Sequence, residues 1–328
     1  MKKILMVAIV SLMIIVISGC IGQNEVKINA NDGLSINSFV VEPSRIEYTD
    51  KADFYLEIEN VGGTTASNIQ AELYGVTWTE LETREPPNGK LSPPDIRFTP
   101  PVAGGYSVLK WLDVQAPKLP EGLEHTYDIT ARVTYDYKTT GVANIYGITK
   151  DEYRRRQQSG TTTSTVTVTN TNAPVKIDVT GSQIVIDTSS LSIQDEPIME
   201  VPLRITFTNV GSGVPITDGV NGKITGTITL EGASAFGASL KDCIDSSGGG
   251  STVNVDTIIR EGKTVTRPCT LVINKEAWLT RPEGTLNMIF DLRYRYYVEA
   301  STKLTVVGTK YGGTGGAGDS GSSYIIDV

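Results

Sequence analysis

The segments FYLEIENVGG, at residues 54–63, and LRITFTNVGS, at residues 203–212, share one pattern in two distant parts of the chain. Each alternates apolar and polar residues over the length of a β-strand and then ends in Asn-Val-Gly. Such alternation is typical of a strand with one buried face and one solvated face. Because Asn and Gly tolerate a positive φ or a loose turn, we expect each strand to leave its sheet at this ending.

A second pair of segments repeats in the same way. HTYDITARVTYDY at residues 125–137 and LNMIFDLRYRYYV at residues 286–298 are Tyr-rich alternating strands, and we expect a hairpin and a last Thr/Val-rich strand after each. Other short alternating segments follow one another from Leu34 onward, separated by Gly, Pro, Asn or Asp. The sequence therefore predicts an all-β protein of two tandem immunoglobulin-like β-sandwiches, residues 34–172 and 173–311, joined end to end as a stiff rod.

The first predicted domain resembles a known family of cell-surface modules. Pro43 follows its first strand, and a later strand ends in Asn-x-Gly, as in archaeal and bacterial modules of the CARDB type. These are immunoglobulin-like sandwiches named for a proposed link to adhesion. The resemblance covers residues 34–170 and, more loosely, residues 175–310, and it implies a cell-surface role. A proline-rich insertion at residues 79–105 and the cysteines of the second domain depart from it.

The N-terminal residues predict export and attachment to a membrane. Two lysines precede an apolar run at residues 4–17, which has the length of a secretory signal. The following ISGC resembles the lipobox of prokaryotic lipoproteins, which implies removal of residues 1–19 and lipidation of Cys20 at the start of a tether, residues 20–33. The alternative is an uncleaved membrane helix. In both cases we expect the rod to project from the extracellular or periplasmic face of a cell membrane.

Charge and cysteine content exclude several classes of protein. The formal net charge of −8 argues against nucleic acid as a partner. With Cys20 assigned to the anchor, Cys243 and Cys269 remain as an even pair in an exported region, and we expect them to form a disulfide. Two cysteines without a nearby histidine supply too few ligands for a metal. No nucleotide-binding motif occurs either, so we expect no metal and no cofactor.

The proline-rich insertion at residues 79–105 is the best candidate in the first domain for a surface that recognises a partner. Loops of this length without secondary structure of their own are usually functional or disordered. Its three Pro-Pro pairs favour rigid extended conformations, with Trp78 at the start of the insertion and Phe98 within it. A protein or a surface glycan would be the partner. The alternative is a lid that packs Ile96 and Phe98 over an open sheet edge.

A run of three arginines is a second candidate. Arg154, Arg155 and Arg156 lie in a segment, residues 149–158, that begins with a Thr-x-x-Glu capping box and predicts a short helix. In an acidic protein these arginines could bind an anionic glycan, a lipid headgroup or an acidic surface. The alternative is a solvated helix end, since a charge run usually marks an exposed face.

The C-terminal residues 312–328 are a Gly/Ser-rich tail that ends in YIIDV. Tyr324, Ile325 and Ile326 could add a strand to an exposed sheet edge of the same molecule or of another copy, which would cause self-association. The tail also contains GDSG around Ser320, as trypsin-like proteases do at their nucleophile. The chain has a single histidine and the motif lies in a low-complexity run, so we assign no catalytic role to it.

Taken together, these patterns predict a membrane-anchored, non-enzymatic protein that acts in binding or adhesion or as a spacer. One alternative is a structural subunit of an extracellular assembly in which the tail adds a strand to a neighbour. Another is an exported hydrolase, which a cleft lined by two close carboxylates would favour, because paired acids meet only in three dimensions.

Overall fold

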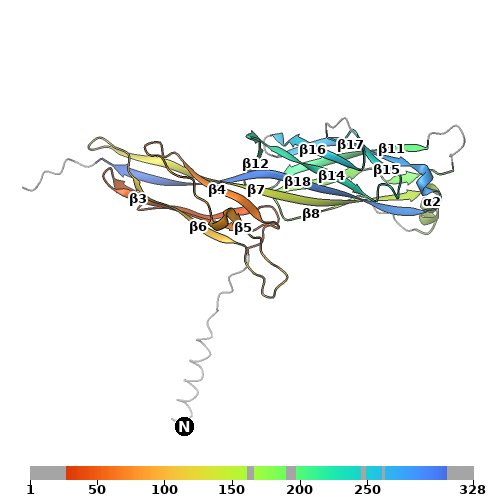
Figure 1. The fold of residues 1–328 in the computed structure, drawn as a ribbon, viewed down its shortest axis with the longest axis horizontal. Helices are drawn as coiled ribbons and strands as arrows, with labels where there is room; N and C mark the ends of the chain where they lie inside the picture. Colours follow the sequence, from red (N-terminus) through yellow and green to blue (C-terminus); the bar gives the residue numbers. More distant parts are fainter. Residues whose placement is uncertain (1–26, 161–165, 190–196, 245–248, 261–262, 309–328) are drawn as a thin grey trace, which may run out of the picture.

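The computed structural model describes residues 27–160, 166–189, 197–244, 249–260 and 263–308. The predicted leader, Cys20 and the tail from residue 312 lie outside these ranges. The molecule is elongated, and two β-sandwiches follow one another along its long axis (Figure 1). The all-β sandwich fold that the sequence predicts is thereby confirmed. Among the described residues, no helix is long and apolar enough to cross a bilayer.

The first sandwich packs a three-stranded antiparallel sheet against part of an eleven-stranded sheet. The small sheet has the order β1-β3-β6, with β1 (Leu34–Glu42), β3 (Lys51–Asn60) and β6 (Tyr106–Gln115). The large sheet contributes β2 (Arg45–Glu47), β4 (Ala66–Tyr74), β5 (Lys90–Leu91) and parts of β7 (Glu124–Thr149) and β18 (Glu283–Val307). A short 3-10 helix, η1 (Pro87–Gly89), precedes β5.

The second sandwich packs a four-stranded sheet against the remaining part of the large sheet. The four strands, in the order β15-β17-β11-β9, are β9 (Val175–Gly181), β11 (Ile198–Asn209), β15 (Ala238–Lys241) and β17 (Thr264–Asn274). The large sheet adds β8 (Thr167–Asn170), β10 (Ile184–Ile186), β12 (Val214–Thr217), β13 (Val220–Asn221), β14 (Lys223–Glu231) and β16 (Thr252–Ile258). The 3-10 helix η3 (Lys275–Trp278) follows β17, and helix α2 (Lys150–Gln158) lies at the far end of the molecule (Figure 1).

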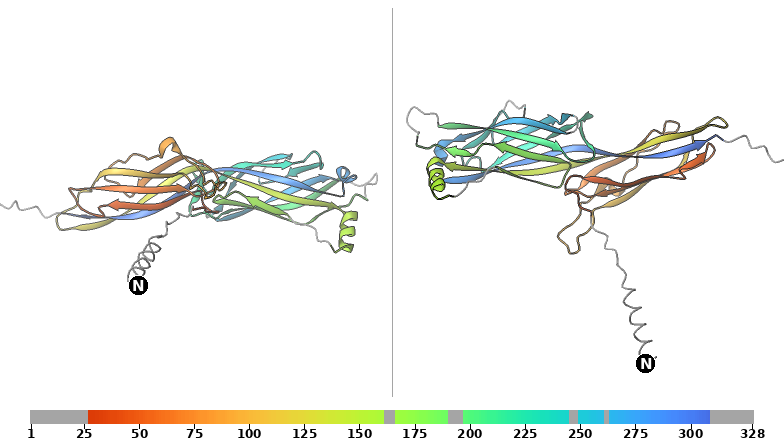
Figure 2. Two further views of the ribbon diagram at one scale, coloured as in Figure 1. Left: turned by 90° about the horizontal axis from the view of Figure 1, so that it is seen from below. Right: turned by 180° about the vertical axis from the view of Figure 1, so that it is seen from behind.

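Strands β7 and β18 run through both sandwiches. They pair antiparallel along their length, from Glu124 opposite Val307 to Ile148 opposite Glu283, without a register shift. In the first sandwich β7 pairs with β4, and in the second it pairs with β8 and β10. Similarly, β18 pairs with β14 in the second sandwich and with β2 in the first. Both views in Figure 2 show this long ribbon crossing from one sandwich to the other.

The expected hairpins after the Tyr-rich segments are therefore wrong. Each Tyr-rich segment continues straight on and supplies the neighbouring sandwich with a strand. The strands consequently do not divide between residues 172 and 173: the end of β18 belongs to the first sandwich, and the second half of β7 belongs to the second. The physical reason is that buried and partly exposed residues keep alternating through the middle of β7, with Gly141 paired inside the ladder, so no residue forces a turn.

Each sandwich has its own large buried aromatic side chain, Trp111 in the first and Trp278 in the second. The predicted disulfide between Cys243 and Cys269 is confirmed, and both cysteines are buried. It ties the segment after β15 to β17 within the second sandwich. The two strands that end in Asn-Val-Gly are β3 and β11, which occupy matching central positions in the two smaller sheets.

Candidate functional site

The region where the two sandwiches meet, called the waist here, has two chemically different faces. Successive side chains of a strand point to opposite faces of a sheet. Alternate residues in the middle of the β7–β18 ladder therefore lie on opposite faces. One face carries the buried tyrosines Tyr135, Tyr137, Tyr294 and Tyr296. The other carries the charged residues Asp136, Lys138, Arg293 and Arg295. We call these the tyrosine face and the charged face.

The tyrosine face holds a turn from each sandwich in the same way. The Tyr137 hydroxyl accepts a hydrogen bond from the backbone N–H of Thr64 (3.2 Å), and the Tyr296 hydroxyl accepts one from that of Gly213 (3.0 Å). Burial raises the pKa of both tyrosines, so both stay neutral hydroxyls. Tyr296 also donates to the side-chain oxygen of Asn209 (2.9 Å). This face is a structural seam with satisfied polar groups.

The Asn-Val-Gly endings stabilise these turns through hydrogen bonds and close packing. The side-chain amide of Asn60 donates to the Thr64 carbonyl (2.9 Å), and that of Asn209 donates to the Gly213 carbonyl (2.8 Å). The expected positive φ does not occur at either asparagine or at the glycines that follow. Glycine is needed there for space instead, because a Cβ at Gly62 or Gly211 would collide with a tyrosine hydroxyl.

The described chain begins at the waist, on the tyrosine face, and not at an end of the molecule. The backbone N–H of Leu34 donates to the Tyr135 hydroxyl (3.1 Å), and that of Asn29 donates to the Val61 carbonyl (2.9 Å). Figure 1 shows that the described C-terminal residues leave at the far end of the first sandwich, opposite the end that carries α2. The N-terminal side of the chain is thus joined to the middle of the rod.

Part of the proline-rich insertion also starts at the waist. Residues 92–105, which we call the waist loop, are closed at their base by a hydrogen bond from the Gly105 N–H to the Ser92 carbonyl (2.8 Å). The base is fixed to β3 because the Asn60 N–H donates to the Gly105 carbonyl (2.9 Å). Figures 1 and 2 show this loop leaving the long axis on the side where the described chain begins.

The tip of the waist loop exposes apolar side chains. Ile96, Phe98 and Val102 are 68, 57 and 52% exposed, so Ile96 and Phe98 do not pack over a sheet edge as a lid would. Asp95 and Val102 exchange two backbone hydrogen bonds of 2.9 Å, which narrows the loop below its tip. Arg97 binds Asp95 through two side-chain hydrogen bonds and lowers the pKa of that carboxyl to about 2.

Trp78, the other aromatic candidate of the insertion, lies elsewhere. Its indole N–H donates to the Gln115 carbonyl (2.7 Å) at the end of β6, and its ring lies 4.8 Å from that of Tyr127. It lines a hollow of about 740 Å³ beside Tyr48. Phe98 lies in the waist loop, before the start of β6, whereas Trp78 contacts the end of β6. The structure therefore does not bring the two aromatic residues together.

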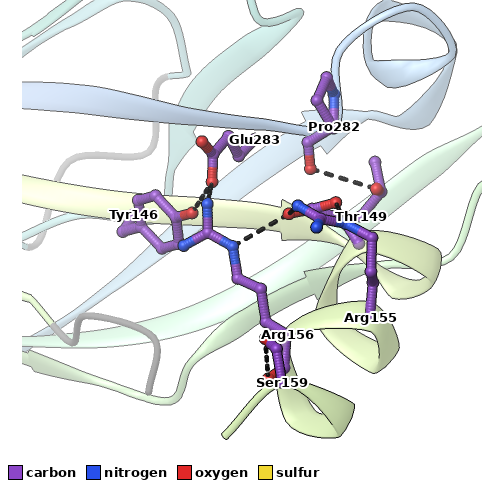
Figure 3. A network of polar contacts seen from close by, with 8 residues as sticks. Tyr146, Thr149, Arg155, Arg156, Ser159, Pro282 and Glu283 are labelled. Atoms are coloured by element: carbon purple, nitrogen blue, oxygen red, sulfur yellow. Dashed lines mark hydrogen bonds and ion pairs between the residues drawn. The ribbon is translucent and has the colours of Figure 1, made fainter. Parts of the chain in front are cut away.

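The arginine run lies on α2 at the far end of the second sandwich (Figure 1), and Figure 3 shows Arg155 and Arg156 from close by. Arg155 and Arg156 both bind Glu152, at 2.5 and 3.0 Å, and Arg156 also pairs with Glu283. These two arginines lower the pKa of Glu152 to about 2. Arg154 makes a single long pair, at 3.9 Å, with Asp151. Because acids on the same structure neutralise two of the three arginines, the arrangement favours a solvated helix end.

The predicted helix is present, but the capping box is wrong. Thr149 is the N-cap residue with extended backbone angles, yet its hydroxyl makes no cap hydrogen bond and donates to the Pro282 carbonyl (3.1 Å). The Glu152 carboxylate accepts hydrogen bonds from Arg155 and Arg156. Both side chains bind other neighbours and do not make the capping-box hydrogen bonds that the local sequence favours.

Two hollows flank the Asp136–Arg295 pair on the charged face. The first, of about 370 Å³, is lined by charged residues of the ladder and by hydroxyls from both sandwiches: Thr65, Ser67, Asp136, Lys138, Thr217, Thr225, Arg293 and Arg295, with Tyr137 and Tyr294. The second, of about 530 Å³, is more polar and includes Asn68, Gln70, Glu85, Asn88, Asp136 and Arg295. Together they form the waist cleft, which exists only because the sandwiches share strands.

The waist cleft has more positive than negative side chains in its first hollow. Lys138 and Arg293 share the carboxylate of Asp291, at 3.0 and 3.5 Å, and Arg295 lies 3.3 Å from Asp136. Burial opposes ionisation of Asp291, but its two cationic partners hold its pKa below the usual range. At the first hollow three cations thus face two carboxylates, and Glu85 adds a third carboxylate in the second hollow.

Sequence reasoning missed the waist cleft. Arg-x-Arg at residues 293–295 fits the alternation of an ordinary half-buried strand, and nothing in the sequence shows that Asp136 and Lys138 lie opposite these arginines. The one available signal is that charged residues interrupt both Tyr-rich segments at matching places. In the described residues, no group of three or more His, Cys, Asp or Glu side chains is placed to hold a metal.

The fold and the cleft define an all-β protein of two sandwiches that share strands. No family model matches the chain, and no curated protein sequence matches it. Three solved structures are distantly similar: red sea bream transglutaminase (12% identity, 84% of this chain and 31% of that chain, TM-score 0.16), a β-sandwich carbohydrate-binding module (9%, 84% and 96%, 0.14) and the collagen adhesin of S. aureus (8%, 86% and 95%, 0.13). The chain spans less than a third of the transglutaminase. These similarities do not identify what the chain binds.

Proposed function

We propose that the protein is a membrane-anchored, non-enzymatic binding protein that holds an acidic glycan in the waist cleft. The observation that carries the proposal is the open cationic cluster of Lys138, Arg293 and Arg295 in an otherwise acidic protein. The side chain of Arg293 is 75% exposed and that of Lys138 is 44% exposed, so both are accessible to a ligand.

The chemistry of the lining suits a sugar that carries carboxylates. A guanidinium binds a carboxylate through two parallel hydrogen bonds, and Lys138 adds a point charge beside it. The Thr65 and Ser67 hydroxyls can both donate and accept hydrogen bonds, as sugar hydroxyls require. Those of Thr217 and Thr225 donate to backbone carbonyls and can accept. A hollow of about 370 Å³ lies within the usual size range of small-ligand sites.

The proposed anchor and the waist cleft are compatible in space. The described chain begins on the tyrosine face, where Leu34 contacts Tyr135, whereas the waist cleft lies on the charged face. An anchor at Cys20 would therefore hold the molecule from the side opposite the cleft, and the cleft would stay open to glycans outside the membrane.

Calorimetric titration of the full chain with an oligogalacturonate, against a neutral galactose oligomer of the same length, tests this function. We expect binding of the acidic oligomer that weakens with salt. Arg293→Gln and Lys138→Gln should each weaken it about tenfold, since hydrogen bonds to charged groups contribute about 1.5–3 kcal/mol. The matched control is Lys303→Gln, whose exposed side chain pairs with Asp128 on the same ladder. Equal binding of both oligomers, or an equal effect of the control, would contradict the proposal.

A hydrolase is the second candidate, because Glu85 and Asp136 line one hollow. Each carboxylate accepts an amide hydrogen bond, Glu85 from Gln70 (3.2 Å) and Asp136 from Asn68 (2.6 Å). Glycoside hydrolysis needs one such acid protonated and the other ionised. Chromatography of the oligogalacturonate after long incubation separates the two functions: we expect intact oligomer, and shortened products that disappear with Glu85→Gln would establish hydrolysis.

A further inference from the structure

We propose that the waist loop inserts its apolar tip into the lipid interface, so that the rod lies along the membrane with its tyrosine face toward the bilayer. The inference rests on the proposed function for its membrane anchor at Cys20. It does not depend on the glycan, which would bind on the opposite face.

The tip of the waist loop has the composition of a segment that enters a bilayer interface. Ile96, Phe98 and Val102 are exposed together within one loop, whereas single exposed apolar residues elsewhere need no explanation. Phe and aliphatic side chains are typical of the apolar face of segments that lie in a membrane interface. Pro100 and Pro101 carry no backbone N–H, so they bring no donor that lipid would leave unsatisfied.

The charges of the waist loop do not oppose this contact. Its only ionisable side chains are Asp95 and Arg97, which bind each other, so the loop is neutral in a protein of net charge −8. The side chain of Arg97 is 84% exposed and stands between Ile96 and Phe98 in the sequence. An arginine in this place can direct its charged end to lipid phosphates while neighbouring apolar groups lie deeper.

The waist loop is held firmly at its base. Asn60 bonds the Gly105 carbonyl through its backbone N–H (2.9 Å) and the Leu91 carbonyl through its side chain (2.8 Å). At Gly104, a Cβ would collide with the Asn60 carbonyl, so glycine permits the close contact of the loop with β3. The apolar tip is therefore presented from a fixed place on the waist.

The length of chain between Cys20 and the waist brings this side of the molecule to the membrane. The backbone N–H of Asn29 donates a hydrogen bond to the carbonyl of Val61. The residue before Val61 is Asn60, which holds the base of the waist loop. From Cys20 to Asn29 the chain can span at most about 30 Å, at roughly 3.5 Å per residue. A lipid on Cys20 would thus keep the waist near the bilayer, with the loop on the same side. The rod would then lie flat, and not project end-on as the sequence alone suggests.

The test uses the lipidated full chain, reconstituted in phosphatidylcholine–phosphatidylglycerol vesicles and carrying Phe98→Cys labelled with the environment-sensitive dye NBD. With Cys20 acylated and Cys243 bonded to Cys269, the new cysteine is the only free thiol. We expect a blue-shifted NBD emission and at least a twofold protection from iodide quenching when vesicles are present. The matched control is Leu123→Cys, 54% exposed at the far end of the first sandwich, which should stay fully accessible to iodide.

The possible results separate the proposals. If the protein floats with vesicles but the label at residue 98 stays as accessible as the one at residue 123, the inference about the loop is overturned and the anchor stands. If the wild-type chain does not float, the anchor itself is overturned, and the loop inference with it. A blue shift that grows with protein concentration without lipid would instead show that a second copy covers the loop. Val102→Cys is a second reporter, should labelling at residue 98 impair folding.

Discussion

The two corners, which are the turns at residues 60–62 and 209–211, place the same Asn-Val-Gly tripeptide in different surroundings. Asn60 is completely buried, and its side chain bonds the carbonyls of Thr64 and Leu91 and accepts from the Gly62 N–H. Asn209 is partly exposed, and its side chain bonds the Gly213 carbonyl and the Tyr296 hydroxyl.

The difference lies in what each corner holds. Both fix a turn against a tyrosine of the shared ladder, but the first also fixes the base of the proline-rich insertion through Leu91. In the part of the second sandwich that the structure describes, no such loop is attached at the corner, and the disulfide and α2 lie elsewhere. The repeat thus supplies a common joint, and in the first copy one additional hydrogen bond fixes the base of the waist loop.

Ending the chain after Tyr296 would break the sharing of strands. The first sandwich would lose the segment of β18 that lies between β7 and β2, together with the buried Val298, Leu304 and Val306. The second sandwich would keep the rest of β18. We expect hydrogen exchange to show loss of amide protection throughout β1, β3 and β6, with protection retained in β11 and β17. Protection retained in both smaller sheets would mean that the first sandwich does not need the shared strand.

Alanine substitution of Asn60 and of Asn209 would compare how much each corner contributes to the free energy of unfolding. Asn60→Ala leaves two buried backbone groups and one partly buried one without their partner, and we expect a loss of about 3 kcal/mol in the free energy of unfolding. Asn209→Ala removes two partners in a partly solvated place and should cost about 1–2 kcal/mol. Urea denaturation of both variants provides the values. Equal losses would show that the bond from Asn60 to Leu91 adds nothing.

The smallest effect concerns one partly buried carboxylate in each sandwich, Asp95 in the waist loop and Glu152 on α2. Cationic partners lower the pKa of each to about 2. Because both folded pKa values lie below the ordinary ones, the stabilising contribution of each pair is complete above about pH 5 and is lost as the pH falls toward 2. NMR titration should show that Arg97→Gln raises the pKa of Asp95 toward its ordinary value, although the backbone N–H of residue 97 still donates to that carboxylate. Arg155→Gln should restore the pKa of Glu152 only in part, since Arg156 remains; full restoration would contradict the shared pair.

Local sequence patterns predicted much of the fold correctly. The ends of β3 and β11 at Asn60 and Asn209 follow from the alternation and the turn residues after it. The Cys243–Cys269 bond follows from counting thiols under the expectation that this region is exported. The helix at residues 150–158 was predicted, although its cap was not, because the Thr149 hydroxyl finds a partner on a segment distant in sequence. The candidate site was mostly missed: Trp78 and Phe98 lie apart, and the charged residues of the waist cleft resembled an ordinary strand surface.

The sequence by itself determined the all-β class, the repeat, and which face of each strand is buried, because a period of two residues is a local property. Only the tertiary structure decided that the Tyr-rich strands run straight into the neighbouring sandwich. Alternation buries the same side chains whether a strand turns back or continues, so the choice depends on partners far away in the chain. The waist cleft follows from that choice, since it arises only where Asp136 and Lys138 of β7 lie beside Arg293 and Arg295 of β18.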